Sequence, residues 1–213
     1  YKKALEGDKG PNTGGMGAYS PAPVVTEAVH RKIMDQIMLP TVRAMAAEGR
    51  PYRGVLYAGL MIKGGDPKVL EYNVRFGDPE AQPLIMRMES DLVPVLEAVV
   101  NQRLRDIEIQ WRPDPAVCVV MAAGGYPGAH DTGRPISGLA GAASLTDVMV
   151  FHAGTARRDN TIVTNGGRVL GVTALGRDIP DAIARAYRAV EGIHWDGVHY
   201  RTDIGRKAVK RAP

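Results

Sequence analysis

The sequence has few of several residue types that particular functions require. One cysteine, Cys118, among 213 residues excludes an internal disulfide and a zinc site built from clustered cysteines. Two Phe and two Trp leave few rings for stacking against nucleic-acid bases. No apolar run approaches the ~20 residues that span a bilayer, and no signal peptide opens the chain. We therefore expect a cytoplasmic protein that binds neither a membrane nor a nucleic acid.

The residues that are abundant indicate a folded protein with many turns. An apolar content of 45%, a charged content of 23% and a net charge of +4 are ordinary for a chain that buries a core. The 25 Gly and 15 Pro favour numerous turns. Cys118 lies in an apolar run, so a buried and inert thiol is favoured over a nucleophile. The basic tail at 206–211 is typical of a solvated helix end.

The sequence changes near residues 106–115 to short runs typical of β-strands, which predicts two domains, 1–107 and 108–213. The first contains a loop at 7–23, a helix from a Thr26 cap to Gly49 that Pro40 interrupts, a hairpin of 54–62 with 68–73, and a helix capped by Ser90 that ends near Leu104. The second contains strands at 116–123, 149–154, 161–164 and 168–175, then a helix from Pro180. The expected fold class is α+β.

One segment combines a carboxylate, an amide and a guanidinium. If residues 68–75 are extended, Glu71, Asn73 and Arg75 share one face, because strand side chains alternate. Carboxylate and amide oxygens suit Mg²⁺, and an arginine can neutralise a phosphoryl group in transfer. An exposed polar face on an edge strand explains the same pattern, and the residues alone leave both interpretations open.

Two glycine-rich segments are candidates for anion binding. Residues 14–17 hold three glycines, which let a backbone approach an anion closely. Neither a Walker loop nor a dinucleotide-binding fingerprint is present, and a plain surface loop remains the alternative. In the run 164–168, Asn165-Gly166 favours a bare hairpin turn, although the glycines beside Arg168 also suit a phosphate. The run 124–128 has the same ambiguity.

Together these segments resemble a known enzyme family. The motifs are Asp8–Tyr19 (DKGPNTGGMGAY), Glu71–Glu80 (EYNVRFGDPE), Met121–Gly128 (MAAGGYPG), Phe151–Thr155 (FHAGT) and Thr164–Leu170 (TNGGRVL). In this order they resemble the phosphoribosylamine–glycine ligase family, also called glycinamide ribonucleotide synthetases. The resemblance covers nearly all of this chain and only about the C-terminal half of a family member.

The resemblance implies part of an ATP-grasp domain, with an antiparallel sheet and helices, followed by a small, mainly β C-terminal domain with one or more helices. It implies an ADP-forming carbon–nitrogen ligase that joins glycine to 5-phosphoribosylamine in purine biosynthesis, using ATP and Mg²⁺ or Mn²⁺. By the same resemblance, Glu71 and Asn73 hold the metal and Arg75 is catalytic. The implied substrate-binding residues are Asp8, Gly14, Gly15, Asp78, Glu80, Gly166, Gly167 and Arg168.

The chain opens at Tyr1 and runs directly into a motif-like segment, so we expect a piece of a longer protein. The resemblance then implies that its partner is the missing N-terminal half, and that the piece alone does not turn over. A monomer or a homodimer is expected. Alternatives are another ATP-grasp carboxylate–amine ligase and a noncatalytic phosphate-binding fragment.

Overall fold

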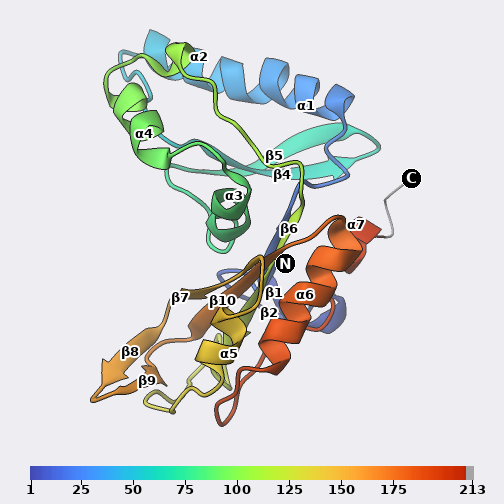
Figure 1. The fold of residues 1–213 in the computed structure, drawn as a ribbon. Coiled ribbons are helices and arrows are strands. Elements are labelled where there is room, and N and C mark those ends of the chain that lie inside the picture. Colours follow the sequence, from blue (N-terminus) through green and yellow to red (C-terminus); the bar gives the residue numbers. More distant parts are fainter. Residues whose placement is uncertain (210–213) are drawn as a thin grey trace. The chain divides into compact units, whose positions relative to one another are not determined.

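The computed structural model describes residues 1–209, and its contacts divide them into two compact units (Figure 1). The sheet unit comprises residues 1–20, 78–87 and 112–209, and the hairpin unit comprises residues 21–77 and 88–111. The domain boundary at 107/108 remains a prediction. The last residues of the basic tail, Lys210 and Arg211, lie outside the described part of the chain.

The sheet unit is built around one four-stranded antiparallel sheet in the order β3-β6-β10-β7. Its elements are β1 (Lys3–Leu5), η1 (Glu6–Asp8), β2 (Lys9–Asn12), β3 (Gly17–Ser20), α3 (Ala81–Arg87), β6 (Ala116–Ala122), α5 (Leu139–Ala143), β7 (Val148–His152), β8 (Thr155–Arg158), β9 (Thr161–Thr164), β10 (Arg168–Leu175), α6 (Ile179–Glu191) and α7 (Arg206–Val209). Two-stranded sheets β1-β2 and β8-β9 complete it.

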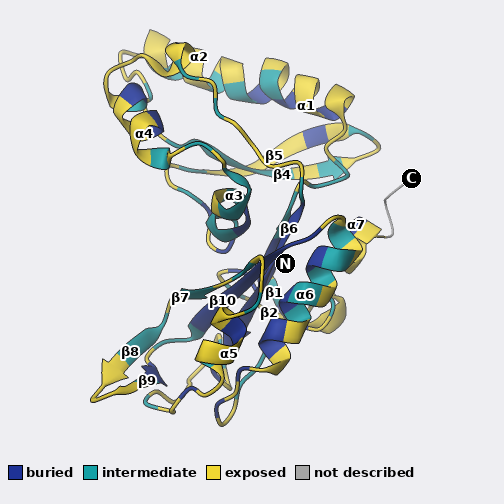
Figure 2. Cartoon of the chain, viewed as in Figure 1, coloured by how far each residue is buried: buried dark blue, intermediate teal, exposed yellow. Residues whose placement is uncertain are grey.

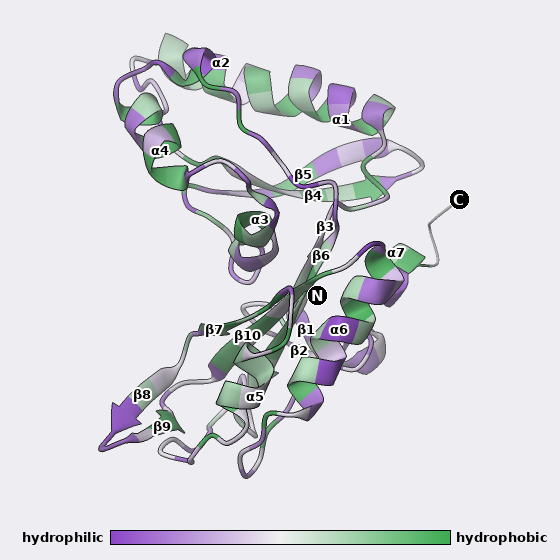
Figure 3. Cartoon of the chain, in the orientation of Figure 1, coloured by the Kyte–Doolittle hydropathy of each residue, from purple (hydrophilic) through white to green (hydrophobic). Residues whose placement is uncertain are grey.

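Both faces of the central sheet are covered, which explains why β6 is apolar at every position. One face carries Val117 and Val119 in the main core, against the buried side of α6, as the dark helix face in Figure 2 shows. Helix α3 packs against β6 and β10 on the other face, near Cys118 and Gly171. A strand buried on both faces has no need of polar alternation. Figure 3 accordingly colours β6 and β10 as hydrophobic.

Burial of Cys118 confirms the expectation of a buried thiol. Desolvation in the apolar sheet raises the pKa of this thiol to about 12. A thiol with such a pKa carries almost no thiolate near neutral pH, and the thiolate is the reactive form. The residue therefore contributes packing to the sheet.

A buried arginine ties the two ends of the sheet unit together. Arg201 is fully buried, and its guanidinium donates to both carboxylate oxygens of Asp203 at 2.7 Å. It also donates to the Lys3 carbonyl at 3.0 Å and to Asp8 at 3.1 Å, and it lies 4.8 Å from the centroid of the Tyr1 ring. These bonds satisfy a charge that would be costly to bury without partners.

The hairpin unit contains α1 (Glu27–Ile33), the π-helical turn η2 (Met34–Met38), α2 (Leu39–Ala47), β4 (Tyr57–Lys63), β5 (Asp66–Asn73), α4 (Leu92–Val100) and η3 (Leu104–Asp106). The Thr26 cap is confirmed, because its side chain accepts a hydrogen bond from the Val29 N–H. The predicted interruption at Pro40 takes the form of the π turn, in which the Leu39 N–H donates to the Met34 carbonyl. The helix then continues through Pro40.

The predicted hairpin is confirmed, with strands β4 and β5 joined through Gly64 and Gly65. Both glycines have positive φ, 58° and 76°, as a type I′ turn requires. A register shift lies between Gly59 and Leu60. Strand β5 ends at Asn73, so the expectation that residues 68–75 are all extended is wrong for the last two.

Other local expectations need correction. Residues 7–23 were expected to be a loop, yet they supply β2 and β3, because strand pairing compensates for poor local propensity. The cap of α4 is Asp91, whose carboxylate accepts from the Val93 N–H, whereas the Ser90 hydroxyl accepts from Gln110. This helix ends at Val100, short of Leu104. Among residues 1–209, no helix is both long and apolar enough to cross a membrane.

We expect Arg201→Met to lower the free energy of unfolding by about 3–5 kcal/mol, because it leaves buried acceptors without their cation. Urea unfolding measures this change. The matched control is Arg31→Met, which breaks an exposed ion pair with Glu27 at 2.6 Å and should cost less than about 1 kcal/mol. Equal effects of the two substitutions would contradict the role given to Arg201.

The same cluster predicts a pH dependence. Hydrogen bonds from Arg201 hold the pKa of Asp203 below its usual value of 3.8. A depressed folded-state pKa adds stability that is complete above the unfolded value and is lost as pH falls through the folded value. The stability of the wild type should therefore decline below about pH 4. Arg201→Met should show a shallower decline when unfolding is followed from pH 5 to pH 2.

Candidate functional site

Strand register brings four glycine-containing segments to one end of the central sheet. Residue Arg168, at the start of β10, pairs with Ala122 at the end of β6, and Leu170 pairs with His152 at the end of β7. Near the start of β3, the Met16 carbonyl accepts from Val120 of β6. The loops 13–16, 123–130, 153–154 and 165–167 therefore meet at this end, which we call the glycine end.

The first glycine loop is held by its own threonine and by the N-terminal segment. The Thr13 N–H and hydroxyl both donate to the Lys2 carbonyl, at 2.6 and 2.9 Å. The Thr13 hydroxyl also accepts from the Gly15 N–H at 3.0 Å. The Met16 N–H donates to the Tyr1 carbonyl at 2.8 Å. These bonds give the loop one conformation without using bulky side chains.

An arginine and an aspartate that are 90 residues apart join at the glycine end. The Arg168 guanidinium donates to the Asp78 carboxylate at 2.9 Å and to the Asp78 carbonyl at 2.6 Å. A longer bond of 3.4 Å reaches the Gly15 carbonyl. The expected substrate-binding residues Asp78, Arg168 and Gly15 are thus brought together.

Glycine is required at Gly15 and is favoured at Gly14, where these segments touch. A Cβ on Gly14 would lie 2.8 Å from the Arg168 guanidinium carbon. Gly15 has a φ of +126°, and a Cβ there would lie 2.6 Å from the Pro79 ring. Distances below 3.0 Å are too short for real Cβ contacts, so the glycines permit the close packing.

Two further side chains at the glycine end were not identified from the sequence. The Tyr126 hydroxyl accepts from the Gly14 N–H at 3.0 Å, and its ring lies where a Gly167 Cβ would be, 2.3 Å from Cδ2. His130 packs edge-on to that ring at 6.3 Å and bonds the Gly128 carbonyl through Nδ1 at 2.9 Å. Tyr126 lies inside the motif 121–128, so that motif is the sequence feature from which its place at the glycine end could have been predicted.

The Asn165-Gly166 pair predicts a hairpin turn at 165–167, but the structure has no hairpin there. Strand β9 pairs with β8, whereas β10 pairs with β6 and β7. The turn therefore passes from one sheet to another, and the Asn165 N–H bonds the Gly154 carbonyl at 2.7 Å. The N–H groups of Gly166 and Gly167 have no acceptor within residues 1–209.

Asp8 and Glu80 differ from the other expected substrate-binding residues. The Asp8 carboxylate pairs with Arg201 and Lys207, and the hydrogen bond from Lys207 is the main reason that its pKa is lowered. These contacts give Asp8 a structural role near the N-terminal strands. Glu80 directly precedes α3, and its side chain is half-buried.

The expected metal and catalytic residues lie in the hairpin unit. Glu71 and Asn73 are two residues apart on β5 and therefore share one face of the strand. Gly59 lies opposite Glu71 and leaves space for its side chain, since a Cβ added to Gly59 would lie 3.0 Å from the Glu71 Cγ. Arg75, beyond the strand end, donates to the Asn73 side-chain oxygen at 3.3 Å and to the Phe76 carbonyl at 2.9 Å. The three side chains are therefore close neighbours along one short segment.

This donor set fits a hard cation. One carboxylate and one amide oxygen are hard ligands, and Mg²⁺ usually takes one or two protein ligands together with phosphates and waters. No cluster of three or more His, Cys, Asp or Glu residues suited to a metal occurs in the described part of the chain. A metal here would accordingly depend on the ligands of a bound phosphate compound.

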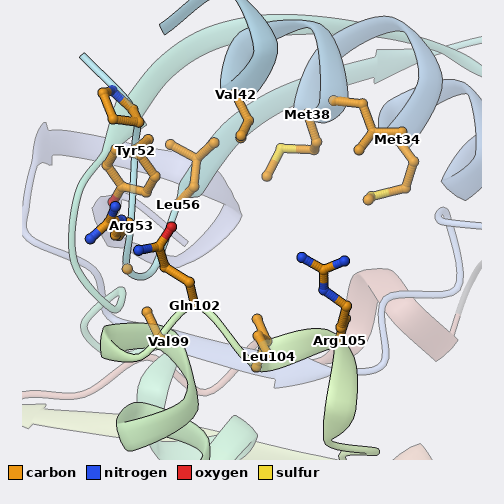
Figure 4. Close-up of a pocket in the computed structure, with 13 residues that line it drawn as sticks. Met34, Met38, Val42, Tyr52, Arg53, Leu56, Val99, Gln102, Leu104 and Arg105 are labelled. Atoms are coloured by element: carbon orange, nitrogen blue, oxygen red, sulfur yellow. The ribbon is translucent and has the colours of Figure 1, made fainter. Parts of the chain in front are cut away.

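The hairpin unit also contains an apolar pocket of about 480 Å³. In Figure 4, Met34, Met38 and Val42 extend from the long helix on one side, and Val99 and Leu104 lie on the other. Tyr52 and Leu56 close one end. Its lining is mainly apolar but includes Arg53, Gln102 and Arg105, and none of the expected site residues belongs to it.

The antiparallel sheets and helices define a class of fold, and comparison with known proteins identifies it as ATP-grasp. The family model "Phosphoribosylglycinamide synthetase, ATP-grasp (A) domain" matches residues 1–81. The model "Phosphoribosylglycinamide synthetase, C domain" matches residues 116–207. The chain belongs to the phosphoribosylglycinamide synthetase family.

Individual relatives agree with this assignment. The phosphoribosylamine–glycine ligase of Pseudomonas aeruginosa is 56% identical over 212 residues, which are 99% of this chain and 49% of the relative. That of Rhodopirellula baltica is 52% identical and is also covered to 49%. The chain therefore spans about half the length of the curated relatives it matches.

Solved structures give the same result. The crystal structure of the Thermotoga maritima phosphoribosylamine–glycine ligase matches 95% of this chain and 49% of that protein, with a TM-score of 0.81 and 37% identity. The Kluyveromyces lactis urea carboxylase matches with a TM-score of 0.63 at 13% identity, and covers 93% of this chain and 17% of that protein. The second match shows a shared fold alone.

We expect Gly15→Ala to disturb the glycine end and to cost about 1–3 kcal/mol of stability, because the added methyl overlaps Pro79 at a positive φ. Gly141→Ala is the control, since it lies within α5 with nothing inside 4 Å of an added Cβ. That change should be neutral or stabilise by up to ~1 kcal/mol. Chemical denaturation compares the two variants. A Gly15→Ala variant as stable as the wild type would show that Pro79 moves away from the added methyl group at little cost.

Proposed function

We propose that this chain is about half of a protein that joins glycine to 5-phosphoribosylamine in the cytoplasm, with ATP as the energy source. The observation that carries the proposal is the meeting of Gly14, Gly15, Asp78, Gly166 and Arg168 at the glycine end, in a chain of this family. Separate segments of sequence are brought together there.

In the proposed reaction, the γ-phosphoryl group of ATP is transferred to the glycine carboxylate, which gives glycyl phosphate and ADP. The amine of phosphoribosylamine then attacks the carbonyl carbon, phosphate leaves, and the nitrogen loses a proton. The product is glycinamide ribonucleotide. Activation is needed because a free carboxylate resists attack by an amine.

The residues of the hairpin unit have the chemistry for the phosphoryl transfer. Glu71 and Asn73 would hold Mg²⁺ or Mn²⁺, which supplies charge neutralisation at the ATP phosphates when bound. Arg75 is placed beside Asn73 by their hydrogen bond and stabilises negative charge on the transferring group. Asp78 and Glu80, which belong to the sheet unit, are proposed to bind the substrates because carboxylates suit amino groups.

The glycine end is proposed to bind the phosphoribosyl part of the substrate. The Gly166 and Gly167 N–H groups lack acceptors in the described structure, and backbone donors of this kind suit a phosphate. Arg168 adds positive charge beside them. Asp8 acts indirectly in this proposal, through the ion pairs that hold the N-terminal strands.

We further propose that the hairpin unit binds the polypeptide corresponding to the N-terminal half of the relatives. The hairpin unit has a mainly apolar pocket, and the large apolar side chains of Leu70, Val74, Val93 and Val100 are exposed, which is typical of a domain that binds another polypeptide. The relatives have about as much additional chain as this one contains. The complex is proposed to be active as a monomer or a homodimer of that combined protein.

Co-expression with that N-terminal half should give a complex that releases ADP only when both glycine and phosphoribosylamine are present. The chain alone should release none. In the complex, Arg75→Met should lower kcat by about 10²–10³, as expected for loss of one transition-state contact. ADP release dependent on a different carboxylate would indicate another ligase, and no release from a stable complex would indicate a noncatalytic protein.

The metal site is tested separately. Glu71→Ala with Asn73→Ala should abolish Mn²⁺ binding in the presence of ATP, measured on the complex by the electron paramagnetic resonance of free Mn²⁺. Asp66→Ala is the control, because this carboxylate lies in the same hairpin and pairs with Lys68. Unchanged Mn²⁺ affinity in the double variant would contradict the assignment of these ligands.

A further inference from the structure

The hydroxyl of Tyr126 occupies the junction of two segments to which the proposed function assigns substrate binding. As an acceptor it bonds the Gly14 N–H at 3.0 Å. Its ring packs on Gly167, where an added Cβ would lie 2.3 Å from Cδ2 and 2.7 Å from Cε2. One side chain therefore spans the distance between the loop at 13–16 and the turn at 165–167.

The hydrogen of this hydroxyl is still available. A tyrosine hydroxyl can accept and donate at once, and no acceptor for the Tyr126 O–H lies within residues 1–209. Accepting a bond from Gly14 polarises the hydroxyl and makes it a stronger donor. The nearby Gly166 and Gly167 N–H groups also lack acceptors. Three donors in one region favour a ligand that carries several acceptor oxygens.

The position of the ring is fixed from both sides. His130 packs edge-on at 6.3 Å and is itself held by the Gly128 carbonyl. On the other side, the Gly167 carbonyl accepts from the Ala123 N–H at 2.8 Å, which joins the turn to the loop that carries Tyr126. A hydroxyl held in this way can contribute to binding without a large loss of side-chain freedom.

Arg168 is less available for a ligand than its charge suggests. Both of its terminal nitrogens already donate to Asp78, and Nη1 also reaches Gly15. The guanidinium therefore holds the loops together and supplies positive charge at short range. Its Nε–H and one Nη2–H have no acceptor within residues 1–209, so the neutral donors act beside this partly used guanidinium.

We propose that Tyr126 is a substrate-binding residue whose hydroxyl donates a hydrogen bond to a phosphate-monoester oxygen while it accepts from Gly14. This inference rests on the proposed function, because it deepens the phosphoribosyl site at the glycine end. The bond is a charge-assisted one, and such bonds are stronger than those between neutral groups. The tyrosine also positions the Gly14 loop.

The test uses the 213-residue chain, because all the residues concerned lie in the sheet unit. Ribose 5-phosphate is the probe, with ribose as the ligand that lacks a phosphate. Binding is measured by titration calorimetry and by the NMR shifts of the Gly166 and Gly167 amides. Tyr126→Phe keeps the ring and removes the hydroxyl. We expect it to weaken ribose 5-phosphate binding about tenfold and to speed hydrogen exchange at the Gly14 amide.

Two other variants separate binding from structure. Tyr187→Phe is the matched control, since the Tyr187 hydroxyl also accepts a backbone N–H, from Ile204 at 3.0 Å, in the core of the same unit. It should lower stability and leave ribose 5-phosphate affinity unchanged. Gly167→Ala keeps the Tyr126 hydroxyl and displaces the ring. Because Gly167 is itself a proposed ligand donor, weaker binding in this variant supports the glycine end as a whole, and unchanged binding contradicts it.

The outcomes distinguish the role of Tyr126 from the existence of the phosphoribosyl site. If the wild type binds ribose 5-phosphate and Tyr126→Phe binds it equally well, the inference about Tyr126 is overturned and the phosphate site stands. If the wild type binds no ribose 5-phosphate, or binds ribose equally, the phosphoribosyl site itself is overturned. If Tyr187→Phe weakens binding as much as Tyr126→Phe, the effect is one of general stability and the inference also fails.

Discussion

The antiparallel register of the central sheet is the constraint on which the glycine end depends. Pairing of Arg168 with Ala122 and of Leu170 with His152 fixes which loops lie at each end of the sheet. A shift of one residue would move every side chain of a strand to the opposite face. With both faces covered by helices, such a shift would expose apolar residues and bury polar ones. The core therefore fixes the positions of loops that contribute little to it.

Small residues at the glycine end allow the loops themselves to come together. Gly154 and Gly166 lie so close that a Cβ on Gly154 would be 2.8 Å from the Gly166 Cα. Backbone surfaces at this spacing leave N–H groups accessible to a ligand. The cost is conformational entropy, since glycine loses more freedom on folding than other residues. Bonds such as that from Arg168 to Asp78 offset this cost.

Periodic segments were the predictable part of this fold, and long-range pairings were not. The hairpin with its Gly64-Gly65 turn and the helix capped by Thr26 follow from local rules. The pairing of β9 with β8 could not be derived from Asn165-Gly166, because a turn sequence does not specify which strands it joins. For the candidate site, motifs predicted Asp78 and Arg168. Only the folded chain shows that they bond each other and that Tyr126 lies beside them.

Arg168 joins the loops of the glycine end with part of its guanidinium. Three of its hydrogen bonds connect segments distant in sequence, while its Nε–H and one Nη2–H have no acceptor within residues 1–209. Breaking them would separate the loops that form the site. Neutral donors with no other acceptor, the backbone of Gly166 and Gly167 and the hydroxyl of Tyr126, can bond a ligand without that loss. The proposed site thus combines an arginine that joins the loops with neutral donors whose hydrogen bonds are not needed to hold those loops.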